Sequence, residues 1–211
     1  RIRFYSSDEQ QRTMLLQAFF SWSQKLRQEG IITQIVLDVY ERELERYGGT
    51  DAIQPIERIF WVQSQAACTL FREQRGSESR IFEAVYALDH FWRNCGYTEA
   101  ECLKALQQCF QPSKEPLEVR QQRKALLAYL AHPPEVLCTL FDQQQDIIVQ
   151  AGKDLRQLAE QNKLSRLEDE ILWSLSHMLC NRLIGTSRER ERKVYTFWLA
   201  SLNARTRNQR A

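Results

Sequence analysis

From Pro55 to Leu202 the sequence is a nearly unbroken succession of helical patterns, and this feature most narrows the folds open to the chain. Apolar residues in this stretch recur at intervals of three and four positions, which places them on one face of each helix. The helix expected after Pro55, for example, carries Ile59, Val62 and Ala66 on such a face. Because hydrophobic residues make up 43% of the 211-residue chain, these faces suffice to form a buried core. The sequence therefore predicts a mainly α-helical protein.

Short signals mark where several of these helices begin and end. Thr98 with Glu101, and Ser165 with Glu168, have the spacing of capping boxes, in which side chains accept hydrogen bonds from the free backbone N–H groups of the first turn. Gly185 is a typical residue to end a helix. We therefore expect one helix to start after Thr98 and another to run from Ser165 to Gly185.

Strand-like patterns occur only at the beginning of the chain. Residues 1–5 alternate charged and large side chains, and residues 31–39 are rich in β-branched residues, and both patterns are typical of strands. A helix between them is predicted to start after Asp8 and to end at Gly30. The expected fold class is mainly α (α+β), a helical domain with a small N-terminal β-sheet element, with residues 1–211 forming a single domain.

Charge and cysteine usage exclude several classes of function. The net charge of +2 gives no support to general nucleic-acid or membrane binding, and no apolar run approaches the roughly 18 residues of a membrane span. The six cysteines form no CxxC pair and no zinc-binding spacing. We expect them to be free, largely buried thiols in a reducing cytoplasm. No metal is expected.

One histidine stands out as a candidate for proton transfer. His177 lies inside the helix predicted to end at Gly185, with Ser174 one turn before it and Asn181 one turn after it. Residues four apart share a helix face, and Arg182 follows on an adjacent face. A neutral imidazole hydrogen-bonded to an amide can act as an acid or base near pH 7. The alternative is a buried histidine with a purely structural hydrogen bond.

Three arginines are candidates for holding an anion. Arg1 and Arg3 alternate with apolar residues, so both point to one face of the predicted strand. Arg46 precedes the pair Gly48-Gly49, which permits a tight turn. Guanidinium groups held in this way suit a carboxylate or an oxyanion. The alternatives are solvated arginines and a local pair of Arg46 with Glu43 or Glu45.

Three motifs in this order together resemble one family. They are Arg1-Ile-Arg3-Phe, then Tyr40-Glu-Arg-Glu43-Leu-Glu-Arg46-Tyr-Gly-Gly, and Ser176-His177-Met-Leu-Cys-Asn181-Arg182-Leu-Ile-Gly. The chain resembles the C-terminal domain of class I lanthipeptide dehydratases, which is also found alone as the thiopeptide-type bacteriocin biosynthesis domain. In that family a separate glutamylation domain transfers glutamate from glutamyl-tRNA to Ser or Thr of a ribosomal precursor peptide. The C-terminal domain then eliminates the glutamate and leaves dehydroalanine or dehydrobutyrine.

The resemblance implies roles for particular residues and partners. The expected partners are the precursor peptide and a fused or separate glutamylation domain, with a homodimer as a further possibility. No cofactor is expected in this domain, since glutamyl-tRNA is used by the glutamylation domain. Carried over to this sequence, the elimination residues are Arg3, Arg46 and His177, with Arg1, Glu43, Asn181 and Arg182 assigned to substrate binding.

Two other functions stay open at this point. Relatives of this domain act as pyridine synthases, which join two dehydroalanines by a formal cycloaddition, although they do not require the Arg/Arg/His set. The second alternative is a module without catalytic activity that binds peptide or holds a dimer together. Family members found alone have further strands before the motif at Arg1–Phe4, so we expect this chain to be the distal part of a longer protein, with an unpaired sheet edge at residues 1–5.

Overall fold

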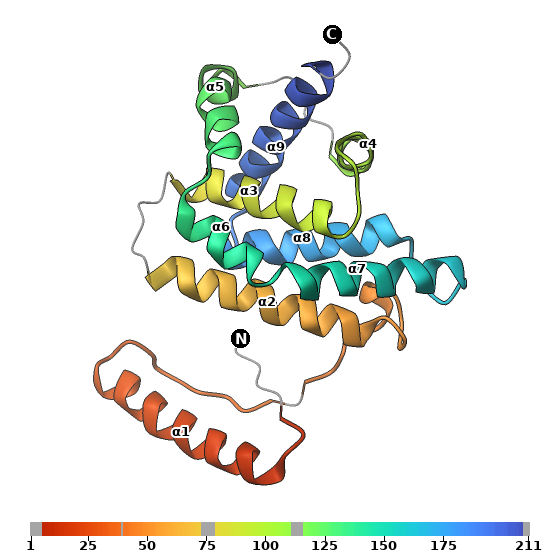
Figure 1. Cartoon of the computed structure of the whole chain (residues 1–211). Helices are drawn as coiled ribbons and strands as arrows, with labels where there is room; N and C mark the ends of the chain where they lie inside the picture. Colours follow the sequence, from red (N-terminus) through yellow and green to blue (C-terminus); the bar gives the residue numbers. More distant parts are fainter. Residues whose placement is uncertain (1–5, 39, 73–78, 111–115, 209–211) are drawn as a thin grey trace. The chain divides into compact units, whose positions relative to one another are not determined.

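The computed structural model describes the chain except for residues 1–5, 39, 73–78, 111–115 and 209–211 (Figure 1). The chain divides into two compact units, Arg1–Arg42 and Glu43–Ala211. Whether they form a single domain, as expected from the sequence, stays a prediction. All regular structure in the described residues is helical, which confirms the mainly α class. The first unit contains α1 (Glu9–Gln28), and the second contains the 3-10 turn η1 (Glu45–Tyr47), α2 (Ile53–Arg72), α3 (Ser79–Asn94), α4 (Glu99–Cys109), α5 (Leu117–Ala131), α6 (Glu135–Asp142), α7 (Gln145–Glu160), α8 (Glu168–Ile184) and α9 (Arg188–Asn208).

The first unit confirms the predicted helix but not the predicted sheet. Asp8 caps α1 by accepting a hydrogen bond from the Gln11 backbone N–H at 2.9 Å. Residues 31–38 follow it as irregular backbone with no strand assignment, so the prediction of a strand at residues 31–39 is wrong over the part described. β-Branched residues favour strands only where a neighbouring strand supplies hydrogen bonds and packing, and the described residues contain no such strand. The predicted strand and sheet edge at residues 1–5 lie outside the described part.

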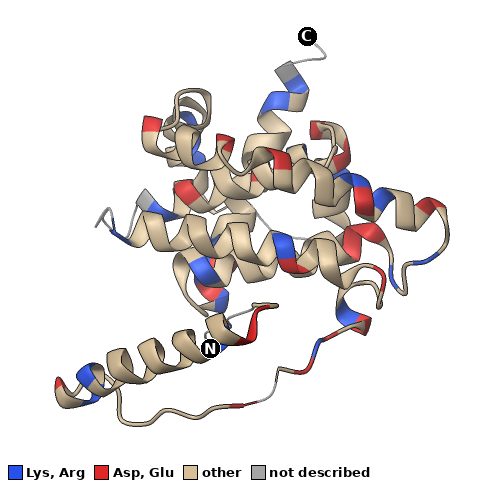
Figure 2. Ribbon diagram, turned by 60° about the horizontal axis from the view of Figure 1, so that its bottom comes forward, with Lys and Arg blue, Asp and Glu red and all other residues tan. Residues whose placement is uncertain are grey.

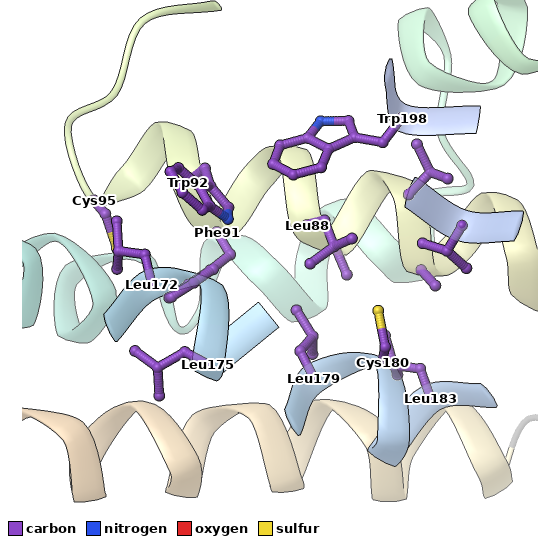
Figure 3. Close-up of a cluster of buried hydrophobic side chains, with 14 of the residues drawn as sticks. Leu88, Phe91, Trp92, Cys95, Leu172, Leu175, Leu179, Cys180, Leu183 and Trp198 are labelled. Carbon is purple, nitrogen blue, oxygen red and sulfur yellow. The ribbon is translucent and has the colours of Figure 1, made fainter. Parts of the chain in front are cut away.

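Helix α8 packs against several other helices of the second unit. It contacts α2, α3, α7 and α9, and Figure 1 shows α2, α7 and α8 running side by side. Between α3 and α8 the space is filled by apolar side chains that are almost completely buried (Figure 3), among them Leu88, Phe91, Leu172 and Leu179. None of the helices in the described ranges is long and apolar enough to cross a membrane.

Two buried tryptophans tie this core together through their indole N–H groups. Trp92 of α3 donates to the Ser176 hydroxyl of α8 at 2.8 Å, and that hydroxyl donates in turn to the Leu172 carbonyl. Trp198 of α9 donates to Asp89 of α3 at 2.9 Å. Because a buried indole N–H without an acceptor is destabilising, these bonds fix the register of three helices.

Only one of the two predicted capping boxes is present. Thr98 and Glu101 form the reciprocal bonds at the start of α4, as predicted. Helix α8 instead begins after Leu167 without a side-chain cap, so the predicted box of Ser165 and Glu168 is wrong. The backbone N–H of Ser165 donates to the Gly48 carbonyl at 3.1 Å, so the residues before α8 contact the turn that follows η1.

The close packing of α7 against the end of α3 requires a glycine. A Cβ added to Gly152 would lie 2.7 Å from the Cα of Cys95, a distance that no relaxed contact permits. In an unconstrained helix, glycine to alanine is stabilising by about 1 kcal/mol. At Gly152 an alanine would instead force the backbone of α7 away from that of Cys95.

We therefore expect Gly152→Ala to lower the free energy of unfolding by about 1–3 kcal/mol, the usual range for overpacking. Urea denaturation followed by circular dichroism measures the change. Gln157→Ala, at an exposed position of the same helix, is the matched control and should stay within about 0.5 kcal/mol of the parent protein. A Gly152→Ala protein as stable as the parent would contradict the close approach.

Candidate functional site

A single pocket brings together two of the residues singled out from the sequence, Arg46 and His177. The pocket has a volume of about 590 Å³, and we call it the His177 pocket. It lies entirely in the second unit, and its walls come from η1, the end of α4, α8 and the first turns of α9. The lining residues are Arg46, Phe110, Trp173, Ser174, His177, Arg188, Glu189, Glu191, Arg192 and Tyr195.

Helix α8 separates the core from the pocket by its own periodicity. Ser176 is fully buried on the α3 side, where it accepts from Trp92. His177, the next residue, is turned about 100° around the helix axis and lines the pocket with Trp173 and Ser174. The predicted shared face with Asn181 is confirmed, because the Asn181 amide lies 3.0 Å from the His177 ring.

Both ring nitrogens of His177 are engaged. Nδ1 lies 2.6 Å from a carboxylate oxygen of Glu191 on α9, and Nε2 lies 3.0 Å from Nδ2 of Asn181. A carboxylate only accepts, so Nδ1 carries the hydrogen, and in the neutral ring Nε2 then holds the lone pair. The side chain is 38% exposed, which leaves it open to the pocket. The pair of Glu191 and Asn181 thus orients the imidazole and selects its tautomer.

The carboxylate that holds His177 is itself held by a buried tyrosine. The Tyr195 hydroxyl donates to the same Glu191 oxygen at 2.8 Å. Burial raises the pKa of Tyr195 above its usual range, and the nearby Cys180 and Glu191 raise it further, so the hydroxyl remains a donor. Its ring stacks on Trp173 with centroids 4.4 Å apart. Trp173, Tyr195 and Glu191 therefore form a rigid wall behind His177.

Arg46 reaches the pocket from the 3-10 turn η1. Its guanidinium lies 3.2 Å from Glu43, so the local ion pair considered from the sequence is formed, while 39% of the side chain stays exposed. The next residue, Tyr47, is buried and packs edge-to-face on Phe60 of α2 with ring centroids 5.0 Å apart. Tyr47 thus anchors the turn, and the Glu43 carboxylate restrains the direction of Arg46.

The turn that carries Arg46 is pressed against α8 through Gly48. Gly48 has φ 91°, and a Cβ there would lie 2.6 Å from Cδ1 of Ile171. The Gly48 carbonyl accepts from the Ser165 backbone N–H, just before α8. The Gly48-Gly49 turn expected from the sequence is therefore present, and its lack of side chains sets Arg46 at a fixed place relative to the helix of His177.

The remaining predicted residues have different placements. Arg1 and Arg3 lie outside the described residues. Arg182 does not line the His177 pocket, because its guanidinium donates to Gln63 and Ser64 of α2 at 3.1 and 3.2 Å. Its predicted role in substrate binding stays a prediction, and the contacts seen are between helices.

Sequence reasoning missed the contribution of α9. The run from Arg188 to Lys193 alternates in sign, which is typical of a solvated helix face, yet its first turns line the pocket. The chain reverses near Gly185, roughly midway between His177 and Glu191, so the two residues come to lie opposite each other on α8 and α9. The nearly equal distance of His177 and Glu191 from Gly185 along the sequence is the signal that could have identified Glu191. Figure 2 shows acidic and basic residues interspersed along the helices, so charge alone does not mark this segment.

No group of three or more His, Cys, Asp or Glu side chains in the described ranges is placed to hold a metal ion. The pocket instead offers a fixed imidazole, several guanidinium groups and aromatic walls. Such a set can move a proton next to a stabilised negative charge without Lewis-acid help. The expectation of a site without a metal or cofactor stays a prediction.

Comparison with known proteins gives a consistent family. The profile of lantibiotic biosynthesis dehydratases, C-terminal part, matches residues 1–202. The subtilin biosynthesis protein SpaB of Bacillus subtilis is 25% identical over 215 residues, which cover 97% of this chain and 21% of SpaB. The epidermin biosynthesis protein EpiB of Staphylococcus epidermidis is 25% identical over 167 residues, 75% of this chain and 16% of EpiB. The chain spans about a fifth of the length of these relatives.

A solved structure shares the fold. The tRNA-dependent lantibiotic dehydratase MibB from Microbispora sp. 107891 superposes with a TM-score of 0.79 over 99% of this chain and 24% of MibB, at 20% identity. The superposition supports the helical architecture described above.

The shared acceptor in the His177 pocket can be tested by its removal. Glu191→Ala leaves the His177 Nδ1–H and the Tyr195 hydroxyl without their acceptor, so we expect a loss of about 1–3 kcal/mol in the free energy of unfolding. Tyr195→Phe keeps the stacking and the contact of Glu191 with His177, and it should lose only about 1 kcal/mol. Nitrogen NMR shifts of His177 should show the Nδ1–H tautomer in the parent and in Tyr195→Phe but not in Glu191→Ala. An unchanged tautomer in all three proteins would contradict the arrangement.

The contact of Gly48 with Ile171 can be separated from backbone strain. Gly48→Ala and Gly49→Ala both place an alanine at positive φ, but only the first creates a short contact, because a Cβ at Gly49 has no neighbour closer than 3.7 Å. We expect Gly48→Ala to lower the free energy of unfolding by about 1–3 kcal/mol more than Gly49→Ala. Ile171→Val removes the Cδ1 atom in the way, so it should recover part of that excess in the double variant. Equal losses for the two glycine variants in urea denaturation would refute the contact.

Proposed function

The chain belongs to the family of lantibiotic dehydratase C-terminal domains, and we propose that it eliminates glutamate from glutamylated Ser or Thr of a ribosomal precursor peptide. The family inferred from the sequence motifs is thereby confirmed. The observation that carries the proposal is the meeting of Arg46 and His177 in one pocket, although they lie far apart in the sequence. The product is dehydroalanine from serine and dehydrobutyrine from threonine.

The elimination requires a base, and His177 is the base in this proposal. The reaction breaks the Cα–H bond, whose electrons form the Cα=Cβ bond, and breaks the Cβ–O bond, whose electrons leave with the glutamate carboxylate. The proton passes to Nε2 of His177, because Nδ1 already donates to Glu191. The Asn181 amide contacts Nε2 and must yield this position to the substrate. A positioned base of this kind contributes roughly 100- to 10,000-fold in rate.

The arginines stabilise the negative charge that develops in this reaction. Loss of the Cα proton places charge on the carbonyl oxygen next to Cα, and a preorganised donor at such an oxygen is worth about 2.7–4 kcal/mol. Arg46 supplies this donor, with Glu43 holding its guanidinium in place. Arg3, which lies outside the described residues, is assigned the same role on the basis of the family resemblance alone.

The same proposal implies a partner domain and a cellular compartment for the reaction. A glutamylation domain, fused or separate, consumes glutamyl-tRNA and supplies the glutamylated peptide, so this chain itself needs neither nucleic acid nor a cofactor. All six cysteines are free in the structure, which supports a reducing compartment such as the cytoplasm.

Mass spectrometry of a glutamylated precursor peptide incubated with the protein at its natural length tests the proposal. We expect loss of glutamate and formation of a dehydro residue. Arg46→Ala and His177→Ala should each lower the rate by roughly 100-fold or more. Arg58→Ala, which removes a surface arginine paired with Asp154, and His132→Ala, at an exposed position, are the matched controls and should retain the parent rate.

Two outcomes would speak against elimination. A glutamylated peptide that binds but stays unchanged would leave a peptide-binding module, and joining of two dehydroalanines without glutamate release would indicate a pyridine synthase. If His177→Ala left the rate of elimination unchanged, His177 would not be the base, but the proposed elimination itself would stand.

A further inference from the structure

Two arginines of the His177 pocket have no part in the proton transfer described above. Arg188 and Arg192 both line the pocket, and they lie one turn apart, on the same face of α9. The Arg192 guanidinium lies 5.8 Å from the centre of the Phe110 ring, which restrains it against the pocket wall. The neighbouring Arg190 differs, because it donates to the Ile184 carbonyl at the end of α8.

The acidic residues of the pocket leave these two arginines available to a ligand. Two acidic residues line the pocket: Glu191 accepts from His177 and Tyr195, and Glu189 is the other. Within the described part of the chain, neither Arg188 nor Arg192 forms an ion pair with a carboxylate. Two adjacent guanidinium groups on one face match the two oxygens of a carboxylate.

The chemistry of the proposed substrate supplies a carboxylate of this kind. Glutamate attached to tRNA is activated at its α-carboxyl group, so the transferred glutamyl group is an ester of that carboxyl and keeps a free side-chain carboxylate and a free ammonium. We propose that Arg188 and Arg192 bind the side-chain carboxylate of the glutamyl group, an assignment that rests on the proposed function. The aromatic walls, Phe110 and Trp173, contact its methylene groups, and Glu189 in the same pocket offers a partner for the ammonium.

This subsite makes the reaction selective for glutamyl over glutaminyl esters. A glutaminyl ester has the same leaving carboxyl group and nearly the same shape but lacks the side-chain charge. Both arginines are exposed, so solvent screens each contact with the carboxylate and keeps it weak. For the pair this predicts a preference of roughly 5- to 20-fold in kcat/KM for the glutamyl ester.

The test compares two synthetic peptides that differ only in an O-glutamyl or an O-glutaminyl serine, with the protein at its natural length. The ratio of their kcat/KM values is measured for the parent, for the double variant Arg188→Gln/Arg192→Gln, and for Arg207→Gln, which removes an exposed arginine at the other end of α9. We expect the ratio to fall to about one in the double variant and to stay at the parent value in Arg207→Gln. A ratio is independent of the fraction of folded enzyme, so partial misfolding does not imitate the result.

The outcomes separate this inference from the proposed function. Elimination from both esters at equal rates by the parent protein, or an unchanged ratio in the double variant, overturns the subsite and leaves glutamate elimination standing. Failure of the parent to release either amino acid, under conditions where the peptides bind, overturns the elimination and the subsite together.

Discussion

The arrangement of the candidate site depends on one contact between a turn and a helix. Gly48 brings the backbone of η1 so near to Ile171 that no side chain fits between them, and the Gly48 carbonyl accepts a hydrogen bond from Ser165. Arg46 lies two residues before this contact, and His177 lies six residues after Ile171 on the same helix. A shift of the turn would therefore move the guanidinium away from the imidazole. Catalysis is sensitive to displacements of about 1 Å, so in the proposed reaction Gly48 would affect the rate through the position of Arg46.

The second constraint is the division of α8 into a core face and a pocket face. Ser176 accepts from Trp92 in the core, while His177 pairs with Glu191 in the pocket. Because the two residues are adjacent, the rotation of α8 that satisfies the indole also points the imidazole at α9. Rigid helices hold such groups more accurately than loops do. Here the buried bond of Ser176 with Trp92 fixes the orientation of the partly exposed bond of His177 with Glu191.

The sequence predicted the local geometry of the candidate site better than it predicted the sheet, for physical reasons. A helical period places His177 and Asn181 together, and the Gly48-Gly49 pair marks the turn beside Arg46; both are local effects. The strand predicted at residues 31–39 needed a partner strand, which is a non-local condition that propensity does not report. Glu191 and Arg188 were hidden in an alternating charge run, because their role depends on which helix the run faces after the turn at Gly185. Arg1 and Arg3, assigned through the family resemblance, lie outside the described residues.

The exposure of the pocket arginines fits the proposed glutamate elimination, in which the leaving group is also a charged product. A buried guanidinium pair would hold glutamate tightly and slow its release, whereas exposed ion pairs are worth at most about 1 kcal/mol each. Arg46 remains 39% exposed and His177 38%, so water can enter the pocket and would solvate the carboxylate that departs in the proposed reaction. The rigid part of the site is the wall of Trp173, Tyr195 and Glu191, which orients His177. In the proposed reaction, strong orientation of His177 combined with weak binding of the leaving group would favour turnover over product inhibition.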